Sequence, residues 1–361
     1  MGGYVRFSIW WLRLWPHWLS SGGMAFWAWL VGPFFPVSNT ARRNLKAAFP
    51  EKNEQEIERL VGGIWANLGR LTADFAQQDR LWDYDPAHPN TGRIEVKGAE
   101  IFERLRDDGR PALFFTAHTG DWELCAIAGA AFHVPGGVLY RAPNNRKAAE
   151  LIEEMRSGTM PGLIRAGRDA GRLMARMLAD GQHIGMLVDQ YWTGGPEVMF
   201  FGRPCATNPT LARLARQFDC PVHGMRVVRL PGARFRIEIT EEVTLPRDVE
   251  GKIDVVGAMQ AVTSIVEGWV REHPEQWLWL HRRWRRGLNM PGLVLKTRLT
   301  RASIAGNRLA GWPVRRHASG SSFCSSPGGR PRAAGATARA SHGETRRLRC
   351  KSFWWIPVAF R

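Results

Sequence analysis

The sequence predicts an α/β fold in which a mixed, largely parallel central sheet is covered by helices. Between residues 93 and 242, short apolar runs alternate with longer segments whose apolar residues recur at helical spacing. This alternation is typical of parallel strands connected by helices. Pro231-Gly232, between the last two apolar runs, predicts a hairpin. With 361 residues, of which 44% are apolar, the chain can bury one large core or two modest ones.

The first 40 residues are predicted to be an apolar, helical membrane anchor. Aromatic and basic residues alternate from Arg6 to Trp15, and residues 14–37 carry no formal charge unless His17 is protonated. Prolines and glycines interrupt this run, so it favours a membrane-dipping or single-pass anchor over one straight span of about 20 residues. Basic residues at positions 42, 43 and 46 follow it, as expected on a cytoplasmic side, and no signal-peptide cleavage site does. A buried N-terminal helix is the alternative.

The remaining elements follow from periodicity and turn signals. After Pro50, Asn53 and Glu56 form an N-cap pattern, and apolar residues at helical spacing continue to Phe75. The apolar stripe of a long helix at 253–270 predicts core packing rather than a binding site. Strands are predicted at 94–96, 112–115, 137–141, 163–165, 184–189, 222–229 and 235–242, and further helices at 101–105, 124–132, 144–155, 171–178 and 211–215.

The net charge of +17 is concentrated near the C-terminus. Residues 293–361 hold 14 lysines and arginines and one acidic residue, Glu344, so the rest of the chain is only mildly basic and nucleic acid is not an expected partner. Residues 291–361 are rich in Arg, Ser, Ala and Gly without apolar periodicity, which predicts a basic, low-complexity, disordered tail. A shifted reading frame would give the same appearance. A cluster of aromatic and basic residues at 275–286 favours contact with a membrane surface.

The spacing of the five cysteines predicts no structural role for them. They show no C-x-x-C spacing and are odd in number, so neither a disulfide framework nor a zinc site is indicated. A reducing compartment fits this pattern.

The stretch PALFFTAHTGDWE, residues 111–123, holds the candidate chemistry. His118 follows a buried strand and precedes a helix, which places it at a strand's carboxyl end, where open α/β sheets bind ligands. Glu123 in the first helical turn can fold back toward the imidazole, so that one ring nitrogen is held while the other accepts a proton from a hydroxyl. Asp121 is a rival for this role. A capping carboxylate beside a structural histidine is the alternative.

Five blocks in order resemble one family. HTGDWE at residues 118–123 is followed by Tyr140-Arg141, by Asp189-Gln190, by FFGRPCAT at 200–207 and by WLWLHRRWR at 277–285. Across about residues 1–290 the sequence is similar to the bacterial lipid A biosynthesis acyltransferases of the lauroyl/myristoyl type, within the lysophospholipid-acyltransferase-like superfamily. The resemblance implies a glycerolipid-acyltransferase-like fold and an acyltransferase domain over residues 41–290, between an anchor at 1–40 and the tail at 291–361.

The resemblance also implies a reaction and a site. A fatty acyl chain would move from an acyl carrier protein or coenzyme A thioester to a hydroxyl of a lipid A precursor, at the cytoplasmic face of the inner membrane. Because a thioester is already activated, no metal, cofactor or covalent intermediate is required. His118 would be the general base and Glu123 its orienting carboxylate. The expected substrate-binding residues are Thr119, Gly120, Asp121, Tyr140, Arg141, Arg156, Asp189 and Gln190, among which Arg141 and Arg156 could hold the oxyanion or a phosphate.

Two alternatives remain at this point. Glycerolipid acyltransferases usually carry an E-G-T-R block, which is absent from this sequence. The acceptor is therefore expected to be a glycolipid, either a lipid A precursor or a phosphatidylinositol mannoside. A different class of function is a non-catalytic membrane-bound or nucleic-acid-binding protein that uses its basic tail.

Overall fold

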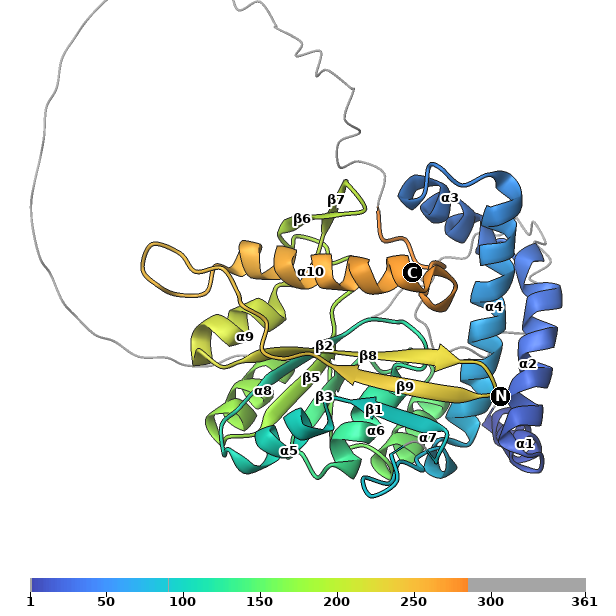
Figure 1. Ribbon diagram of the computed structural model, residues 1–361, viewed down its shortest axis with the longest axis horizontal. Coiled ribbons are helices and arrows are strands. Elements are labelled where there is room, and N and C mark those ends of the chain that lie inside the picture. Colours follow the sequence, from blue (N-terminus) through green and yellow to red (C-terminus); the bar gives the residue numbers. More distant parts are fainter. Residues whose placement is uncertain (1, 90, 285–361) are drawn as a thin grey trace, which may run out of the picture. The chain divides into compact units, whose positions relative to one another are not determined.

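A seven-stranded sheet forms the centre of the computed structural model, which describes residues 2–89 and 91–284 (Figure 1). The predicted tail, residues 291–361, lies outside the described residues. Five of the six neighbouring strand pairs are parallel, and only the β8–β9 hairpin is antiparallel. The predicted mixed, largely parallel sheet is thus confirmed. In spatial order the strands are β1 (Ile94–Lys97), β9 (Arg234–Ile239), β8 (Val222–Leu230), β2 (Leu113–Thr116), β5 (His183–Leu187), β3 (Gly136–Tyr140) and β4 (Gly162–Arg165).

Helices cover both faces of this sheet, and the alternation of side chains along β2 shows why. Leu113 and Phe115 belong to one hydrophobic cluster and Ala112 and Phe114 to another, because successive side chains of a strand point to opposite faces. The first cluster includes residues of α8 (Ala170–Ala179), α9 (Thr210–Phe218) and α10 (Val255–Glu272). The second includes residues of α5 (Ala99–Asp107) and α6 (Glu123–Ala131). In Figure 1, α9 and α10 lie above the sheet and α5 and α6 below it. Helix α7 (Arg146–Ser157) connects β3 to β4.

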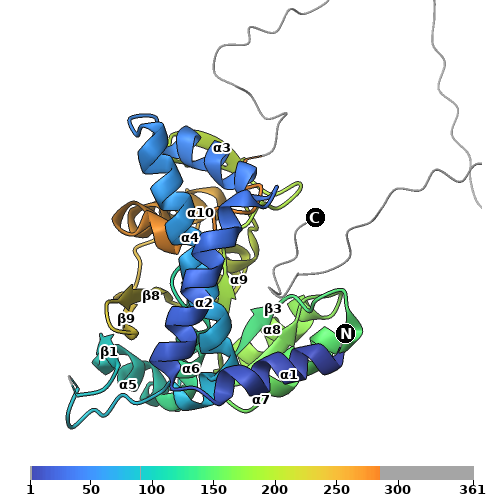
Figure 2. The ribbon, with the colours of Figure 1, turned by 90° about the vertical axis from the view of Figure 1, so that its right-hand side faces the viewer.

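The N-terminal residues fold into several helices instead of one. Pro16 separates α1 (Gly2–Arg13) from α2 (His17–Val31), because its ring removes a backbone donor. A short 3₁₀ turn and α3 (Ser38–Ala48) follow, and α4 (Glu54–Ala76) begins with the predicted capping box between Asn53 and Glu56. Figure 2 shows α2 running beside α4. Their backbones approach closely, since a Cβ on Gly69 would lie 2.2 Å from the Met24 carbonyl oxygen.

The exposure of α2 is the reverse of that of most surface helices. Its buried residues are His17, Ser20, Ser21 and Ala25, which are small or polar, whereas its tryptophans and Phe26 point outward. Among the residues described here, no helix is both long enough and apolar enough to cross a membrane. Of the two predicted forms, membrane-dipping or single-pass, the described residues do not form a single-pass helix: Pro16 interrupts the apolar run, and α2, which follows it, has 15 residues.

Two further expectations need correction. No helix was predicted at residues 38–48, which form α3, and no strands were predicted where β6 (Glu197–Phe200) and β7 (Arg203–Ala206) form a hairpin. The aromatic and basic cluster at 275–286 was expected at a membrane surface. Instead, Trp277, Trp279 and Arg283 are almost completely buried against the core, so this part of the prediction is wrong.

Candidate active site

The turn that carries His118 is fixed by backbone contacts. Gly120 adopts a φ of +59°, and a Cβ there would lie 2.2 Å from the Val227 carbonyl oxygen, so glycine is required. The Gly120 N–H donates to the Gln276 carbonyl at 3.0 Å, and the Leu278 N–H donates to the His118 carbonyl at 3.0 Å. The segment after α10 therefore clamps the turn between β2 and α6.

Asp189, rather than Glu123, is the partner of His118. Asp189 Oδ1 lies 2.8 Å from His118 Nδ1, and Oδ2 accepts the His118 backbone N–H at 2.9 Å. Strands β2 and β5 are parallel neighbours in which Thr116 pairs with Leu187. Two residues beyond that pair, His118 and Asp189 leave the sheet at the same edge and face each other.

The Asp189 carboxylate is held in one orientation and one charge state. Trp277 Nε1 donates to Oδ2 at 2.7 Å, so a buried tryptophan fixes the far side of the carboxylate. Burial acts to raise the pKa of Asp189, but attraction to the His118 ring and hydrogen bonds from His118 outweigh it and hold this pKa well below its usual range. Asp189 is thus an anion at neutral pH. Burial lowers the pKa of the neighbouring His281 to about 4, so that ring is neutral.

Glu123 is engaged elsewhere. Arg156 of α7 donates through Nε to Glu123 Oε2 at 2.9 Å and through a terminal nitrogen to Oε1 at 2.5 Å, and Trp122 Nε1 donates to Oε1 at 3.1 Å. A planar guanidinium matches a carboxylate in this two-pronged geometry, and a nearly buried carboxylate needs such a partner. The expected contact between Glu123 and His118 is therefore wrong, because both carboxylate oxygens are taken and His118 Nδ1 already faces Asp189.

An apolar cavity opens beside these groups. It contains about 810 Å³ of empty space, part of which is open to solvent. Phe102, Phe114, Val138 and Met186 are among the apolar side chains that line it. Its polar lining includes Glu123, Tyr140 and Arg156.

The cavity meets the histidine through an aromatic ring. Trp122 lines the cavity, and its ring centroid lies 5.0 Å from that of His118. The His118 ring and the apolar cavity are thus neighbours. This arrangement can activate a hydroxyl next to a substrate that has an apolar chain.

The sequence matches the family model described as bacterial lipid A biosynthesis acyltransferase over residues 4–286. The chain belongs to this family. The match spans the N-terminal helices, the whole sheet and the candidate site, and it confirms the resemblance drawn from the five sequence blocks. Family membership supports acyl transfer in lipid A biosynthesis.

Individual members of the family are distant relatives. The lipid A biosynthesis palmitoleoyltransferase of Escherichia coli K12 is 24% identical over 297 residues, which cover 76% of this chain and 92% of that protein. The lipid A biosynthesis myristoyltransferase of the same organism is 26% identical over 302 residues, covering 74% and 86%. Lipid A biosynthesis acyltransferase 2 of Shigella flexneri is 26% identical over 262 residues, covering 68% and 77%.

The other predicted site residues of this acyltransferase fall into two groups. Tyr140 and Gln190 reach the site: the Tyr140 ring lies 5.7 Å from the Arg156 guanidinium carbon, and Gln190 Nε2 lies 3.3 Å from His118 Nε2. Burial raises the pKa of Tyr140 to about 12, with a smaller contribution from Glu153, which accepts a hydrogen bond from the Tyr140 hydroxyl.

Thr119 and Arg141 do not reach the cavity. Thr119 is buried in the turn, where its backbone bridges to Trp277. Arg141 is exposed after β3 and does not line the cavity.

Asp121 is not a second partner of His118. It is 2% exposed, and its Oδ1 has no hydrogen-bond partner. Burial, together with the nearby charge of Asp74, raises the pKa of Asp121 well above its usual range. This carboxyl is therefore a buried structural group, in contrast to the expected substrate contact.

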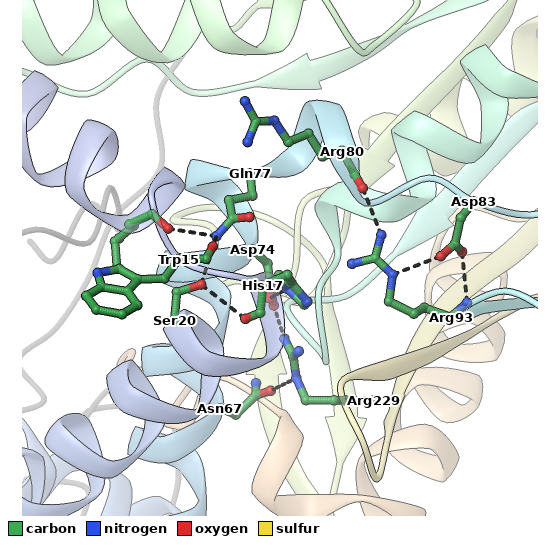
Figure 3. Close-up of polar contacts among 11 residues, drawn as sticks. Trp15, His17, Ser20, Asn67, Asp74, Gln77, Arg80, Asp83, Arg93 and Arg229 are labelled. Carbon is green, nitrogen blue, oxygen red and sulfur yellow. Dashed lines mark hydrogen bonds and ion pairs between the residues drawn. The ribbon is translucent and has the colours of Figure 1, made fainter.

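A buried polar network links helix α2 to the turn (Figure 3). Asp74 of α4 pairs with His17 of α2 through Oδ1 at 2.7 Å and with Arg229 of β8 through Oδ2 at 2.5 Å. Arg229 Nε also donates to Asn67 Oδ1 at 3.0 Å, and the Asn67 amide donates to the Gln276 carbonyl at 3.2 Å. The sequence did not predict this network, because buried polar contacts among four separate segments leave no local pattern.

Proposed function

We propose that this protein transfers a fatty acyl chain from an acyl carrier protein or coenzyme A thioester to a hydroxyl of a lipid A precursor. The observation that supports it most strongly is the buried pair of His118 and Asp189 beside the apolar cavity. In this proposal the cavity takes the acyl chain. Burial of each methylene contributes about 0.8 kcal/mol, so a chain of ordinary fatty acid length is bound largely by its hydrocarbon.

His118 acts as general base in the proposed reaction. Asp189 accepts the proton on Nδ1 in a hydrogen bond, which leaves a lone pair on Nε2 for the acceptor hydroxyl. As Nε2 takes the hydroxyl proton, the oxygen attacks the thioester carbon and forms a tetrahedral oxyanion. The oxyanion collapses, the C–S bond breaks, and the imidazolium returns the proton to the leaving thiolate. The products are an ester and a free thiol, so atoms and charge balance.

The pair formed by Glu123 and Arg156 supports the same step. Arg156 places a positive charge in the cavity wall, and Glu123 fixes its position with two hydrogen bonds. We assign Arg156 the electrostatic stabilisation of the negative charge that develops on the thioester oxygen. Glu123 then acts on the reaction through Arg156 rather than through His118.

The same proposal places the protein at the cytoplasmic face of the inner membrane, held there by its N-terminal helices. Supporting it is a concentration of exposed apolar side chains on residues 7–34, including six tryptophans. Tryptophan favours the boundary between water and lipid, and a helix with this outward face can lie in the interface without crossing the bilayer. The exposed residues are Phe7, Trp10, Trp11, Leu14, Trp15, Trp18, Leu19, Phe26, Trp27, Trp29, Leu30, Val31 and Phe34.

Mass spectrometry of lipids from cells with and without the gene tests the proposed function. We expect lipid A to lose one acyl chain when the gene is absent and to regain it when the wild-type gene is restored, but not when the His118→Ala gene is. Unchanged lipid A, together with a change in the acylation of a phosphatidylinositol mannoside, would assign a different acceptor. If no acylated lipid changed, the proposal would be wrong.

A further inference from the structure

The Gln190 side chain faces the nitrogen of His118 that must accept a proton. Gln190 Nε2 lies 3.3 Å from His118 Nε2. Because Asp189 is an anion and lies 2.8 Å from Nδ1, the neutral ring carries its hydrogen on Nδ1 and a lone pair on Nε2. A lone pair can only accept, so the group opposite it must be the amide N–H of Gln190 and not its carbonyl.

Gln190 is free to move in a way that its neighbours are not. Asp189 is 3% exposed and His118 is 9% exposed, whereas Gln190 is an exposed residue at a bend just beyond β5. Within the described residues, the contact with His118 is the one hydrogen bond of its side chain. The amide therefore covers Nε2 from the solvent side and can be displaced from it without breaking other contacts.

The acceptor hydroxyl needs the position that the Gln190 amide holds. A hydroxyl must approach within roughly 2.6–3.2 Å of Nε2 to give up its proton. Once displaced, the amide N–H remains next to the new bond, where the oxyanion forms. The cation of the cavity wall, Arg156, already uses Nε and one terminal nitrogen on Glu123. The Gln190 amide would add a donor for the oxyanion close to His118.

We propose that Gln190 is a catalytic residue whose amide N–H caps the free nitrogen of His118 in the empty site and, after the acceptor hydroxyl displaces it, donates to the tetrahedral oxyanion. This inference rests on the proposed function and adds a residue to its reaction. The amide makes a hydrogen bond in the transition state that the substrate carbonyl does not need in the ground state. Its removal should therefore lower kcat much more than it changes KM.

Three substitutions of Gln190 test the role of its amide. Two of them keep the size of the side chain, and the third reduces it. Gln190→Glu keeps the shape but replaces the donor with an acceptor, Gln190→Met keeps the length without polar atoms, and Gln190→Ala removes the side chain. For each we expect kcat to fall by about 10² to 10³, the range for loss of one oxyanion donor, with KM changed only a few-fold. Gln217, exposed on α9 at the opposite edge of the parallel strands, provides the matched controls Gln217→Glu and Gln217→Met, which should leave kcat unchanged.

Steady-state kinetics of the purified full chain with an acyl thioester and a lipid A precursor provide the measurement. A thermal unfolding scan of each variant confirms that the fold is retained. If His118→Ala is inactive but the three Gln190 variants keep wild-type kcat, or gain activity with a lower KM, the amide only blocks the base and this inference is overturned while the proposed function stands. If His118→Ala keeps full activity, the proposed function itself fails.

Discussion

Replacing Asp189 with asparagine tests whether this carboxylate fixes the reactive form of His118. Asp189 Oδ2 accepts hydrogen bonds from the His118 backbone N–H and from Trp277 Nε1, whereas Oδ1 faces His118 Nδ1. An asparagine that keeps its oxygen at the Oδ2 position satisfies both of these donors. Its NH₂ group then points at Nδ1.

The size of the effect follows from that orientation. An NH₂ group facing Nδ1 donates to it, so the ring proton moves to Nε2 and the base can no longer accept a proton. The opposite orientation would leave the two buried donors facing an NH₂ group, at a cost of about 1–3 kcal/mol for each unsatisfied group. The inactive tautomer is therefore favoured. Where an aspartate behind a catalytic histidine has been exchanged for asparagine, kcat drops about 10⁴, and we expect a loss of about 10³ to 10⁴ here.

Rates of thioester-dependent acylation, with wild-type protein and the Asp189→Asn and Glu123→Gln variants, provide the assay. Glu123→Gln should lose less, because it keeps one acceptor for Arg156 and leaves the contact between His118 and Asp189 intact. If Asp189→Asn remained within a few-fold of wild type while Glu123→Gln was inactive, the assignment of Asp189 as the partner of the base would be refuted.

Three further predictions concern the cavity, a buried acid and the N-terminal helices. Ala126→Phe, in the cavity lining, should shift the preference for the acyl donor to shorter chains, because each methylene excluded from the cavity costs about 0.8 kcal/mol of binding free energy. Ala130→Phe on the same helix should not change the preferred chain length. Competition assays between donors of different chain length measure this preference. Because the unfolded state releases the Asp121 proton at lower pH than the folded state, the contribution of Asp121 to wild-type stability falls as pH rises above about 4. Asp121→Asn should therefore gain unfolding free energy over wild type from pH 5 to pH 8, measured by urea titration. The Trp18→Glu, Trp27→Glu double variant should lose flotation with anionic vesicles, whereas Leu173→Glu should not.

Each of these predictions has an outcome that contradicts it. Equal chain-length profiles of the two phenylalanine variants would mean that the cavity does not hold the acyl chain. A stability difference for Asp121→Asn that does not change with pH would mean that Asp121 is ionised in the folded protein. If the tryptophan double variant floated with the vesicles as wild type does, α2 would not be the part of the protein that contacts the membrane.

The sequence contained enough information for the sheet but not for the partner of His118. Alternating apolar runs predicted every strand of the central sheet, because such runs are local. The order of those strands is not local, and β5 became the neighbour of β2 although β3 and β4 lie between them in the sequence. Glu123, five residues from His118, was therefore the natural choice over Asp189, which is brought to the base only by that strand order.

Exposure was equally hard to predict from residue type. The tryptophans of residues 10–29 and those at 277 and 279 look alike in sequence, yet the first group is mostly exposed and the second is buried. On α2, small residues such as Ser21 and Ala25 form the face that packs on α4, so the tryptophans lie on the other face. Trp277, in contrast, packs in the core, where its Nε1 donates a hydrogen bond to Asp189. Neither cause can be read from periodicity alone.

Acyl transfer by purified His118→Ala protein is the most direct test of the central claim. The wild-type and variant proteins would be incubated with an acyl thioester and a lipid A precursor, and the acylated product would be followed over time by mass spectrometry. If His118 is the general base, the variant should form product at least about 10² to 10⁴ times more slowly, while a thermal unfolding scan shows that it remains folded. Product formation at close to the wild-type rate would contradict the account.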